Sequence, residues 1–245
     1  MPLGEFELIA RYFSQRFPKR ADVSLGIGDD AALCTLPPGM QLAVAIDTLV
    51  AGVHCPAEPC PSVIGYKALA VNLSDMAAMG AQPAWMTLAL TCPDQTDDKW
   101  LVQFSQGLLE LAQAAQVSLI GGDTTCGPLT VTIQIAGLVP KGSALQRRGA
   151  QVGDGIYVTG TLGDAGLGLA SVQKRVELPQ SAREYVEWRL NRPTPRLSEG
   201  QALLGIANSA IDVSDGLIAD LGHILNASGV GASLQVDRLP LSEAL

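Results

Sequence analysis

The stretch Ser62–Met79, SVIGYKALAVNLSDMAAM, contains the pattern that decides the fold. Its apolar residues recur every three or four positions, as they do on one face of an amphipathic helix, and Ser62 is a suitable N-cap. Short apolar runs typical of strands flank this helix, at Leu42–Ile46 before it and at Trp85–Thr91 after it. The sequence therefore predicts a strand–helix–strand unit, as in α/β proteins.

Similar patterns continue along the rest of the chain. Further helices are predicted at Gly4–Phe17, at Asp98–Ala115, from about Gly163, and at Ser181–Leu190, Leu197–Asn208 and Gly216–Ala227. Further strands are predicted at Ser118–Ile120, Leu129–Val139, Ile156–Thr159, Ile211–Val213 and Ala232–Val236. Because strands and helices alternate in both halves, the predicted fold class is α/β (α+β).

A stretch rich in glycine and polar residues, Pro140–Gly155, separates the two halves. We therefore expect an N-terminal domain over residues 1–145 and a C-terminal α/β domain over residues 146–245. The last residues, Leu239–Leu245, look like the first turn of a helix, so we expect the second domain to be incomplete.

The composition excludes several classes of partner. The chain has 245 residues with a net charge of −8, and no basic cluster exceeds the pair Arg147-Arg148, so nucleic acids and anionic membranes are poor partners. The longest apolar run, Leu129–Val139, is too short to span a bilayer. The five cysteines are scattered without a C-x-x-C pair, which disfavours zinc and fits a reducing cytoplasm.

Aspartates recur beside glycines or after apolar runs in five short segments. These are GIGDD (26–30), IDT (46–48), NLSD (72–75), GGDT (121–124) and IDVSDG (211–216). Turns and helix caps would explain any one of them. However, Asp47 and Asp123 directly follow strand patterns, where α/β folds build their sites, and Asp75 lies within a helix, which aspartate disfavours. Gathered carboxylates without His or Cys favour Mg²⁺.

The phosphate-binding elements are less distinct, because no Walker A or G-x-G-x-x-G motif occurs. The turn at Gly160–Gly168 follows a predicted strand and opens a helix, so it fits a phosphate cradle and an ordinary tight connection equally well. Arg147 or Arg148 could grip a nucleotide phosphate or simply be solvated. His54 follows Asp47 in a loop, and exposure and a functional role are both open for it.

Six segments, taken in order, resemble those of thiamine-monophosphate kinases. They are GIGDDAA (26–32), IDTLV (46–50) followed by His54, YKALAVNLSDMAAMGA (66–81), LIGGDTT (119–125), YVTGTLGD (157–164) and IDVSDGL (211–217). The NLSD helix and the GGD segment also resemble the wider superfamily of aminoimidazole-ribonucleotide synthetase, selenophosphate synthetase and the hydrogenase-maturation dehydratase. The IDVSDGL segment and the spacing to His54 are typical of the kinases.

The resemblance implies a two-domain fold of the aminoimidazole-ribonucleotide synthetase type. The N-terminal four-stranded sheet would pair with that of a second copy to form a barrel, making a homodimer, and ATP would lie between the domains. The implied activity is ATP-dependent phosphorylation of thiamine monophosphate to thiamine diphosphate, by direct in-line transfer with several bridging Mg²⁺ ions.

The same resemblance implies roles for individual residues. The implied magnesium ligands are Asp30, Asp47, Asp75, Asp123, Asp212 and Asp215, with the backbone carbonyl of Ile46. The implied ATP contacts are Gly122, Asp123, Arg147 and Ser214, and His54 is the implied substrate contact. Two features depart from the family: Ala45 and Ile46 stand where some relatives have hydroxyl side chains, and relatives continue past residue 245 with residues that help hold the thiamine ring.

Other functions remain compatible with these residues. One is an ATP-dependent ligase or dehydratase of the same fold, and another is a non-catalytic Mg-ATP-binding module. Selenophosphate synthetase is excluded, because no cysteine precedes Gly26. No Ser-His-Asp or Cys-His arrangement is apparent, so we expect no covalent phosphoenzyme. Because the implied acceptor, a phosphate monoester, is largely dianionic at neutral pH, we expect no essential general base. The exposed edge expected for Leu129–Val139 also favours a homodimer.

Overall fold

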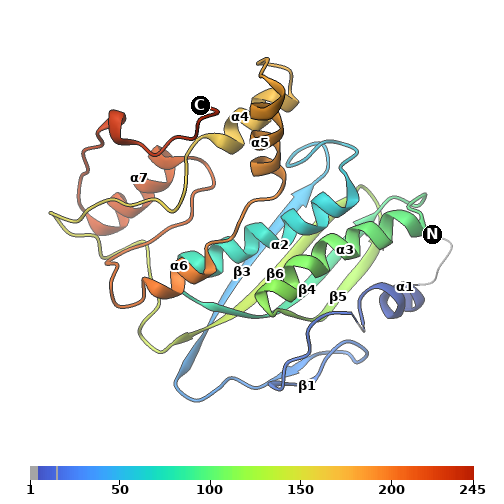
Figure 1. Cartoon of the computed structure of the whole chain (residues 1–245). Coiled ribbons are helices and arrows are strands. Elements are labelled where there is room, and N and C mark those ends of the chain that lie inside the picture. Colours follow the sequence, from blue (N-terminus) through green and yellow to red (C-terminus); the bar gives the residue numbers. More distant parts are fainter. Residues whose placement is uncertain (1–4, 15) are drawn as a thin grey trace.

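The computed structural model describes residues 5–14 and 16–245, and its centre is a four-stranded sheet (Figure 1). The strands are β3 (Met40–Val50), β4 (Gln82–Cys92), β5 (Ser118–Cys126) and β6 (Thr130–Pro140), in the order β3-β6-β4-β5. Strand β6 pairs antiparallel with β3 and with β4, whereas β4 and β5 are parallel. Helices α2 (Pro61–Ala78) and α3 (Asp98–Ala115) lie across one face. The predicted α/β class is confirmed as a mixed sheet with helices.

The alternation of side chains along β3 decides what each face of the sheet carries. Ala43, Ala45 and Leu49 pack into the core beneath the helices, together with Ile133 and Ile135 of β6. Asp47 has the same parity, so it also points to the helix side. The intervening side chains on the other face are highly exposed, at Leu42 (48%), Val44 (54%) and Ile46 (64%).

Helices α2 and α3 approach each other so closely that glycine is required at the crossing. A Cβ atom on Gly65 would lie 2.3 Å from the Phe104 carbonyl oxygen, and one on Gly107 would lie 1.9 Å from that of Ser62. The first turn of α2 begins at Pro61, and its N-cap is Cys60 without a side-chain cap bond. The predicted cap at Ser62 is therefore wrong, because proline, with its fixed φ and no N–H, suits the first helical position.

Gly107→Ala should lower the free energy of unfolding by about 1–3 kcal/mol, because the added methyl group meets backbone that cannot rotate away. Urea denaturation would measure the change. Gly166→Ala is the matched control, since a Cβ atom there meets nothing within 4 Å and the position is helical. A denaturation midpoint of Gly107→Ala equal to that of the control would contradict the close crossing.

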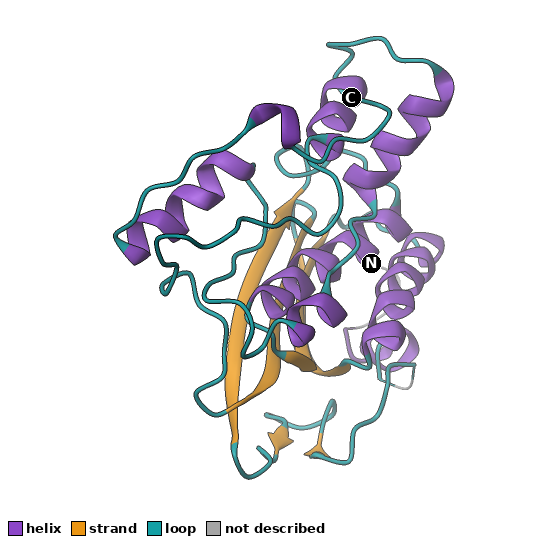
Figure 2. Ribbon diagram, turned by 60° about the vertical axis from the view of Figure 1, so that its left-hand side comes forward, coloured by secondary structure: helices purple, strands orange, loops and turns teal. Residues whose placement is uncertain are grey.

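The second half of the chain consists of helices and irregular segments, as Figure 2 shows. The helices are α4 (Asp164–Val172), α5 (Gln180–Asn191), α6 (Leu197–Ala202), α7 (Leu217–Ser228) and a 3₁₀ turn, η1 (Val236–Arg238). Residues 151–245, all described, contain no strand, so the predicted strands at Ile156–Thr159, Ile211–Val213 and Ala232–Val236 are wrong. These short runs lie beside no pairing strand, and their side chains are largely exposed, as at Tyr157 (93%).

Several boundaries also differ from the prediction. The first helix, α1, is Glu5–Tyr12, and residues 4 and 15 of its predicted range lie outside the described part. Helix α6 ends at Ala202, before a turn with Gly205 at positive φ. A two-stranded sheet, β1 (Val23–Leu25) with β2 (Leu33–Cys34), lies beside the main sheet. In the described part of the chain, no helix is both long and apolar enough to cross a membrane.

The position of β6 corrects one argument for a dimer. This strand, predicted at Leu129–Val139, is paired along both sides, so it has no exposed edge. The sheet edges are instead β3 and β5, and the four strands form an open sheet.

Candidate functional site

Two aspartates meet where β3 passes under α2. Asp47 of β3 and Asp75 of α2 lie within hydrogen-bonding reach of each other. Asp212, in the segment before α7, is close enough for its negative charge to act on both. Arg147, in the connector after β6, places a positive charge near Asp75. Residues from four distant segments of the sequence therefore form one carboxylate cluster, Asp47, Asp75 and Asp212, with one adjacent cation.

The surroundings of this cluster disfavour the negatively charged form of its carboxyl groups. Burial, together with the negative charges of Asp212 and Asp47, raises the pKa of Asp75 to about 6, and the positive charge of Arg147 opposes this shift. Burial also raises the pKa of Asp47, with a smaller contribution from Asp212. Clustered, partly desolvated carboxylates with one nearby arginine fit a hard divalent cation, which prefers oxygen ligands.

Asp75→Asn should stabilise the protein in the absence of divalent cations at pH 7. Because the folded-state pKa of Asp75 is raised, the folded chain keeps a proton that the unfolded chain releases between about pH 4 and pH 6. The contribution of Asp75 to the stability of the wild-type protein is therefore present at low pH and is lost as the pH rises through that window. We expect the variant to melt about 2–4 °C higher at pH 7 and no higher at pH 4. Equal melting shifts at both pH values would contradict the assigned pKa.

The other predicted metal ligands lie outside this cluster. Asp30, Asp123 and Asp215 are exposed, and within residues 5–14 and 16–245 no three His, Cys, Asp or Glu side chains are already arranged as a metal site. The larger ligand set stays a prediction.

The strand ends differ from the prediction at two of these positions. Asp47 and Asp123 lie inside β3 and β5 and do not follow them, because both strands continue to pair with β6 and β4. The side chain of Ile46 points away from Asp47, to the open face, so only its backbone could reach the cluster. Packing alone requires glycine at position 122, since a Cβ atom there would lie 1.9 Å from the Leu88 carbonyl oxygen.

The segment that carries Asp212 is held in place by Asp220, a residue that sequence reasoning missed. The buried Oδ2 atom of Asp220, in the first turn of α7, accepts three successive backbone N–H groups, from Ser214 (2.9 Å), Asp215 (3.1 Å) and Gly216 (3.1 Å). Ser214 Oγ in turn donates to Asp212 Oδ2 (3.1 Å). The sequence did contain a signal for this role, because an acidic residue stands four positions after Gly216, early in a predicted helix.

His54 lies at the end of β3 that follows Asp47, in a tight exposed loop. The Val50 N–H donates to His54 Nδ1 (3.0 Å), while the His54 N–H donates to the Val50 carbonyl oxygen (2.9 Å). An Nδ1 atom that accepts a bond leaves the ring proton of the neutral form on Nε2. The exposed His54 side chain can therefore offer an Nε2–H donor to a bound molecule.

The two adjacent arginines of the connector have different surroundings. Arg147 acts on Asp75, as described above. Arg148 donates through Nε to Gln146 Oε1 (2.6 Å) and lines a cavity of about 310 Å³ between the connector and the segment after α6. Of the two arginines, Arg147 is the one whose charge acts on the carboxylate cluster, and its contact with a nucleotide phosphate stays a prediction.

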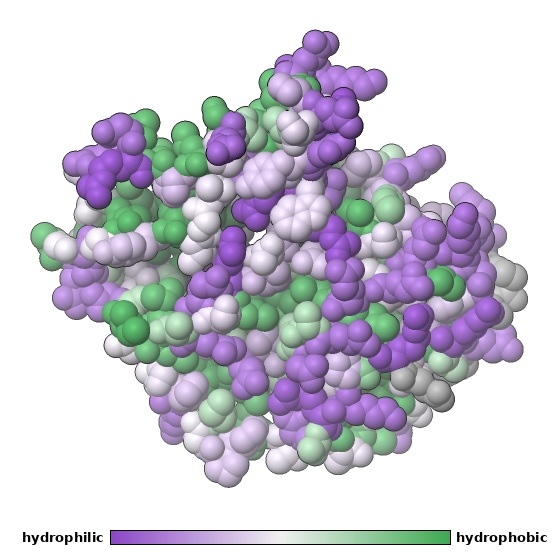
Figure 3. All heavy atoms as spheres, viewed as in Figure 1, coloured by the Kyte–Doolittle hydropathy of each residue, from purple (hydrophilic) through white to green (hydrophobic). Residues whose placement is uncertain are grey.

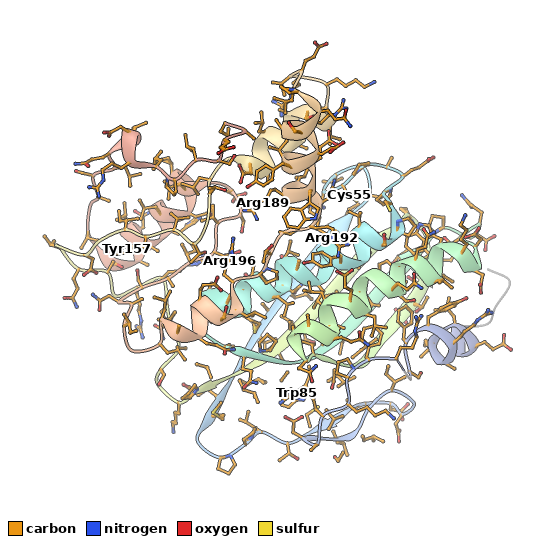
Figure 4. All side chains as sticks on the ribbon, viewed as in Figure 1. Cys55, Trp85, Tyr157, Arg189, Arg192 and Arg196 are labelled. Atoms are coloured by element: carbon orange, nitrogen blue, oxygen red, sulfur yellow. The ribbon has the colours of Figure 1, made fainter. Side chains whose placement is uncertain are left out.

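The Gly160–Gly168 turn is organised around a buried aspartate. Asp164 accepts bonds from Thr161 Oγ1 (2.5 Å), Tyr185 Oη (3.1 Å), Arg189 Nε (3.3 Å) and Ser242 Oγ (2.6 Å). Burial would raise the pKa of Asp164, but these four bonds together lower it. Figure 4 shows Arg189, Arg192 and Arg196 along α5 and the segment after it. These contacts favour a structural connection at this turn.

Comparison with known protein families and solved structures supports the two-domain fold. The chain matches the AIR synthase related protein family, with its N-terminal domain at residues 28–139 and its C-terminal domain at residues 151–245. The structure of thiamine-monophosphate kinase from Stenotrophomonas maltophilia K279a has a TM-score of 0.86 at 48% identity, covering 92% of this chain and 73% of that one. AaThiL complexed with AMPPCP and TMP has a TM-score of 0.80 at 30% identity, covering 90% and 71%.

Sequence relatives match nearly the whole chain. Thiamine-monophosphate kinase of Bacillus subtilis (strain 168) is 38% identical over 249 residues, covering 99% of this chain and 76% of that protein. Its counterpart in Escherichia coli (strain K12) is 55% identical over 246 residues, covering 100% of this chain and 75% of that protein. This chain therefore belongs to the thiamine-monophosphate kinase family, with the two-domain fold of the AIR synthase related proteins.

Proposed function

We propose that this chain transfers the γ-phosphoryl group of ATP to thiamine monophosphate, producing thiamine diphosphate and ADP. The observation that carries the proposal is the carboxylate cluster of Asp47, Asp75 and Asp212, with Arg147 on one side and His54 beyond the end of the same strand. Family membership supports it, as does the structure of the relative AaThiL complexed with AMPPCP and TMP.

The cluster is suited to hold magnesium, as its pKa shifts indicate. Asp47, Asp75 and Asp212 are the ligands that the geometry supports best, and Asp30, Asp123, Asp215 and the Ile46 carbonyl complete the proposed set. Bound Mg²⁺ supplies charge neutralisation at the β- and γ-phosphate oxygens. The remaining ATP contacts are proposed to come from Gly122, Asp123, Arg147 and Ser214.

The chain needs to bind and orient its substrates more than it needs to move protons. The acceptor is a phosphate monoester with a second pKa near ~6, so at neutral pH it already carries a nucleophilic oxygen. His54, through Nε2–H, would hold and orient thiamine monophosphate. No side chain then serves as an essential base, and in-line placement of two phosphates is the main contribution of the protein.

Mass spectrometry of products tests the function directly. The chain would be incubated with Mg-ATP and, separately, thiamine monophosphate, unphosphorylated thiamine or no acceptor. We expect thiamine diphosphate and ADP in equal amounts, only with thiamine monophosphate. Inorganic phosphate with an altered carbonyl or amide acceptor would instead indicate a ligase or dehydratase, and ATP binding without any product would indicate a non-catalytic module.

A homodimer is proposed from the open face of the sheet. Leu42, Val44 and Ile46 are exposed apolar side chains on this face, whereas hydrophilic and hydrophobic residues are mixed over the face seen in Figure 3. Two such sheets facing each other would bury the apolar residues and close a barrel. Light scattering should give twice the chain mass at micromolar concentration, and a stable monomer would rule the dimer out.

Two further assignments are also proposals. The division into residues 1–145, which carry most of the ATP and metal site, and residues 146–245 follows the connector after β6. A cytoplasmic location is supported by free thiols at all five cysteines and by cytosolic ATP as the substrate.

A further inference from the structure

Lys67 is a half-buried lysine of α2 without an acidic partner. It forms no salt bridge within residues 5–14 and 16–245, where the ion pairs are made by arginines. Burial lowers the pKa of its ammonium group, and the adjacent Cys55 thiol acts in the opposite direction. A partly desolvated ammonium that lacks a counter-ion is costly, so a position of this kind is suited to a bound anion.

The position of Lys67 along α2 links it to the site. Lys67 and Asp75 are eight residues apart, which places them on one face of the helix, about 12 Å apart along its axis. Lys67 also lies beside Cys55, the residue after His54, in the loop that closes with a Gly52 N–H to Cys55 carbonyl bond (2.9 Å). Figure 4 shows Cys55 at the end of α2 where that helix begins.

The site therefore has two ends with different charges. At one end the carboxylate cluster and Arg147 suit a metal-bound nucleotide. At the other end Lys67 offers a positive charge and His54 Nε2–H a hydrogen bond, and the one carboxylate of the loop 51–60, Glu58, is exposed. A dianionic phosphate fits the second end better than the first.

We propose that Lys67 binds the phosphate group of thiamine monophosphate and holds it between His54 and the carboxylate cluster. The assignment rests on the proposed function and adds a specificity determinant to it. Lys67 is what lets the protein distinguish thiamine monophosphate from unphosphorylated thiamine, because only the former carries the anion that it pairs with.

Calorimetric titration with the two ligands tests this assignment. Wild-type protein should bind thiamine monophosphate more tightly than thiamine. Lys67→Met should weaken thiamine monophosphate binding about 10- to 100-fold, as expected for a lost charged hydrogen bond, and leave thiamine binding unchanged. Lys67→Arg should retain most of the preference. In turnover, Lys67→Met should raise the KM for thiamine monophosphate and leave the KM for ATP nearly unchanged.

Controls separate the possible failures. Lys99→Met removes an exposed lysine of α3 and should change nothing, and Lys67→Gln, which keeps a polar side chain of similar length, replaces Lys67→Met if that variant does not fold. Wild-type protein that fails to bind thiamine monophosphate would overturn the proposed function. Two results would overturn the role of Lys67 alone, provided that the wild-type protein binds thiamine monophosphate. One is an unchanged preference for thiamine monophosphate over thiamine in both neutral Lys67 variants, and the other is a rise only in the KM for ATP.

Discussion

Asp75→Asn should lower kcat by at least about 1000-fold with Mg-ATP and thiamine monophosphate. Asp75 is the centre of the carboxylate cluster, since it contacts Asp47 and the charges of both Asp212 and Arg147 act on its pKa. Asparagine has nearly the same shape but lacks the charge that holds a divalent cation. Charge neutralisation on the transferring group accounts for much of the catalysis in phosphoryl transfer, so the loss of this neutralisation should lower kcat.

Steady-state thiamine diphosphate formation at saturating substrates would measure this effect. Asp237→Asn is a matched control, because Asp237 is exposed and lies in η1, and it should retain full activity. If Asp75→Asn kept near-native kcat at millimolar magnesium, the cluster would not be the catalytic metal site. The same variant should be more stable than wild type without divalent cations, so misfolding would not explain a loss of activity.

Asp220→Ala should lower kcat/KM for ATP about 100-fold, although Asp220 is not expected to touch a substrate. Its carboxylate oxygen fixes three backbone N–H groups of the segment that carries Asp212 and Ser214. Without that acceptor the segment loses its geometry, and small displacements of positioning groups are costly in rate. Stability should also fall by about 1–3 kcal/mol.

Asp220→Asn separates this positioning role from a need for charge. Its amide oxygen can accept the same three N–H groups, so it should restore most of the activity lost in Asp220→Ala. The KM for thiamine monophosphate should change less than that for ATP, because His54 lies on a different loop. Native kinetics in Asp220→Ala would show that the three bonds do not position the segment.

Periodic patterns in the sequence predicted the elements near the site well. The helix predicted at Ser62–Met79 is α2, Pro61–Ala78, and the one predicted at Asp98–Ala115 has those bounds as α3. Their apolar spacing is strong because each helix buries a continuous side against a neighbour. Among the separated aspartates, Asp47, Asp75 and Asp212 lie close enough for their charges to act on one another, and their role as metal ligands stays a prediction.

The failures come from features that depend on distant neighbours. A strand needs a partner, and the run Ile211–Val213 has apolar strand residues but lies beside no strand. Strand order is likewise non-local, so the sequence could not place β6 between β3 and β4. Asp220 was missed because the backbone groups that it binds belong to an irregular segment, whose conformation has no periodic pattern.

The central claim is that the cluster around Asp75 holds the divalent cations of the reaction, and counting bound Mn²⁺ tests it most directly. Mn²⁺ replaces Mg²⁺ at oxygen-ligand sites, and electron paramagnetic resonance of the free ion gives the number bound. With a non-hydrolysable ATP analogue present, wild-type protein should bind more than one Mn²⁺ per chain, and Asp75→Asn should bind fewer, with at least about 10-fold weaker affinity for those that remain. Equal numbers and equal affinities in the two proteins would contradict the account.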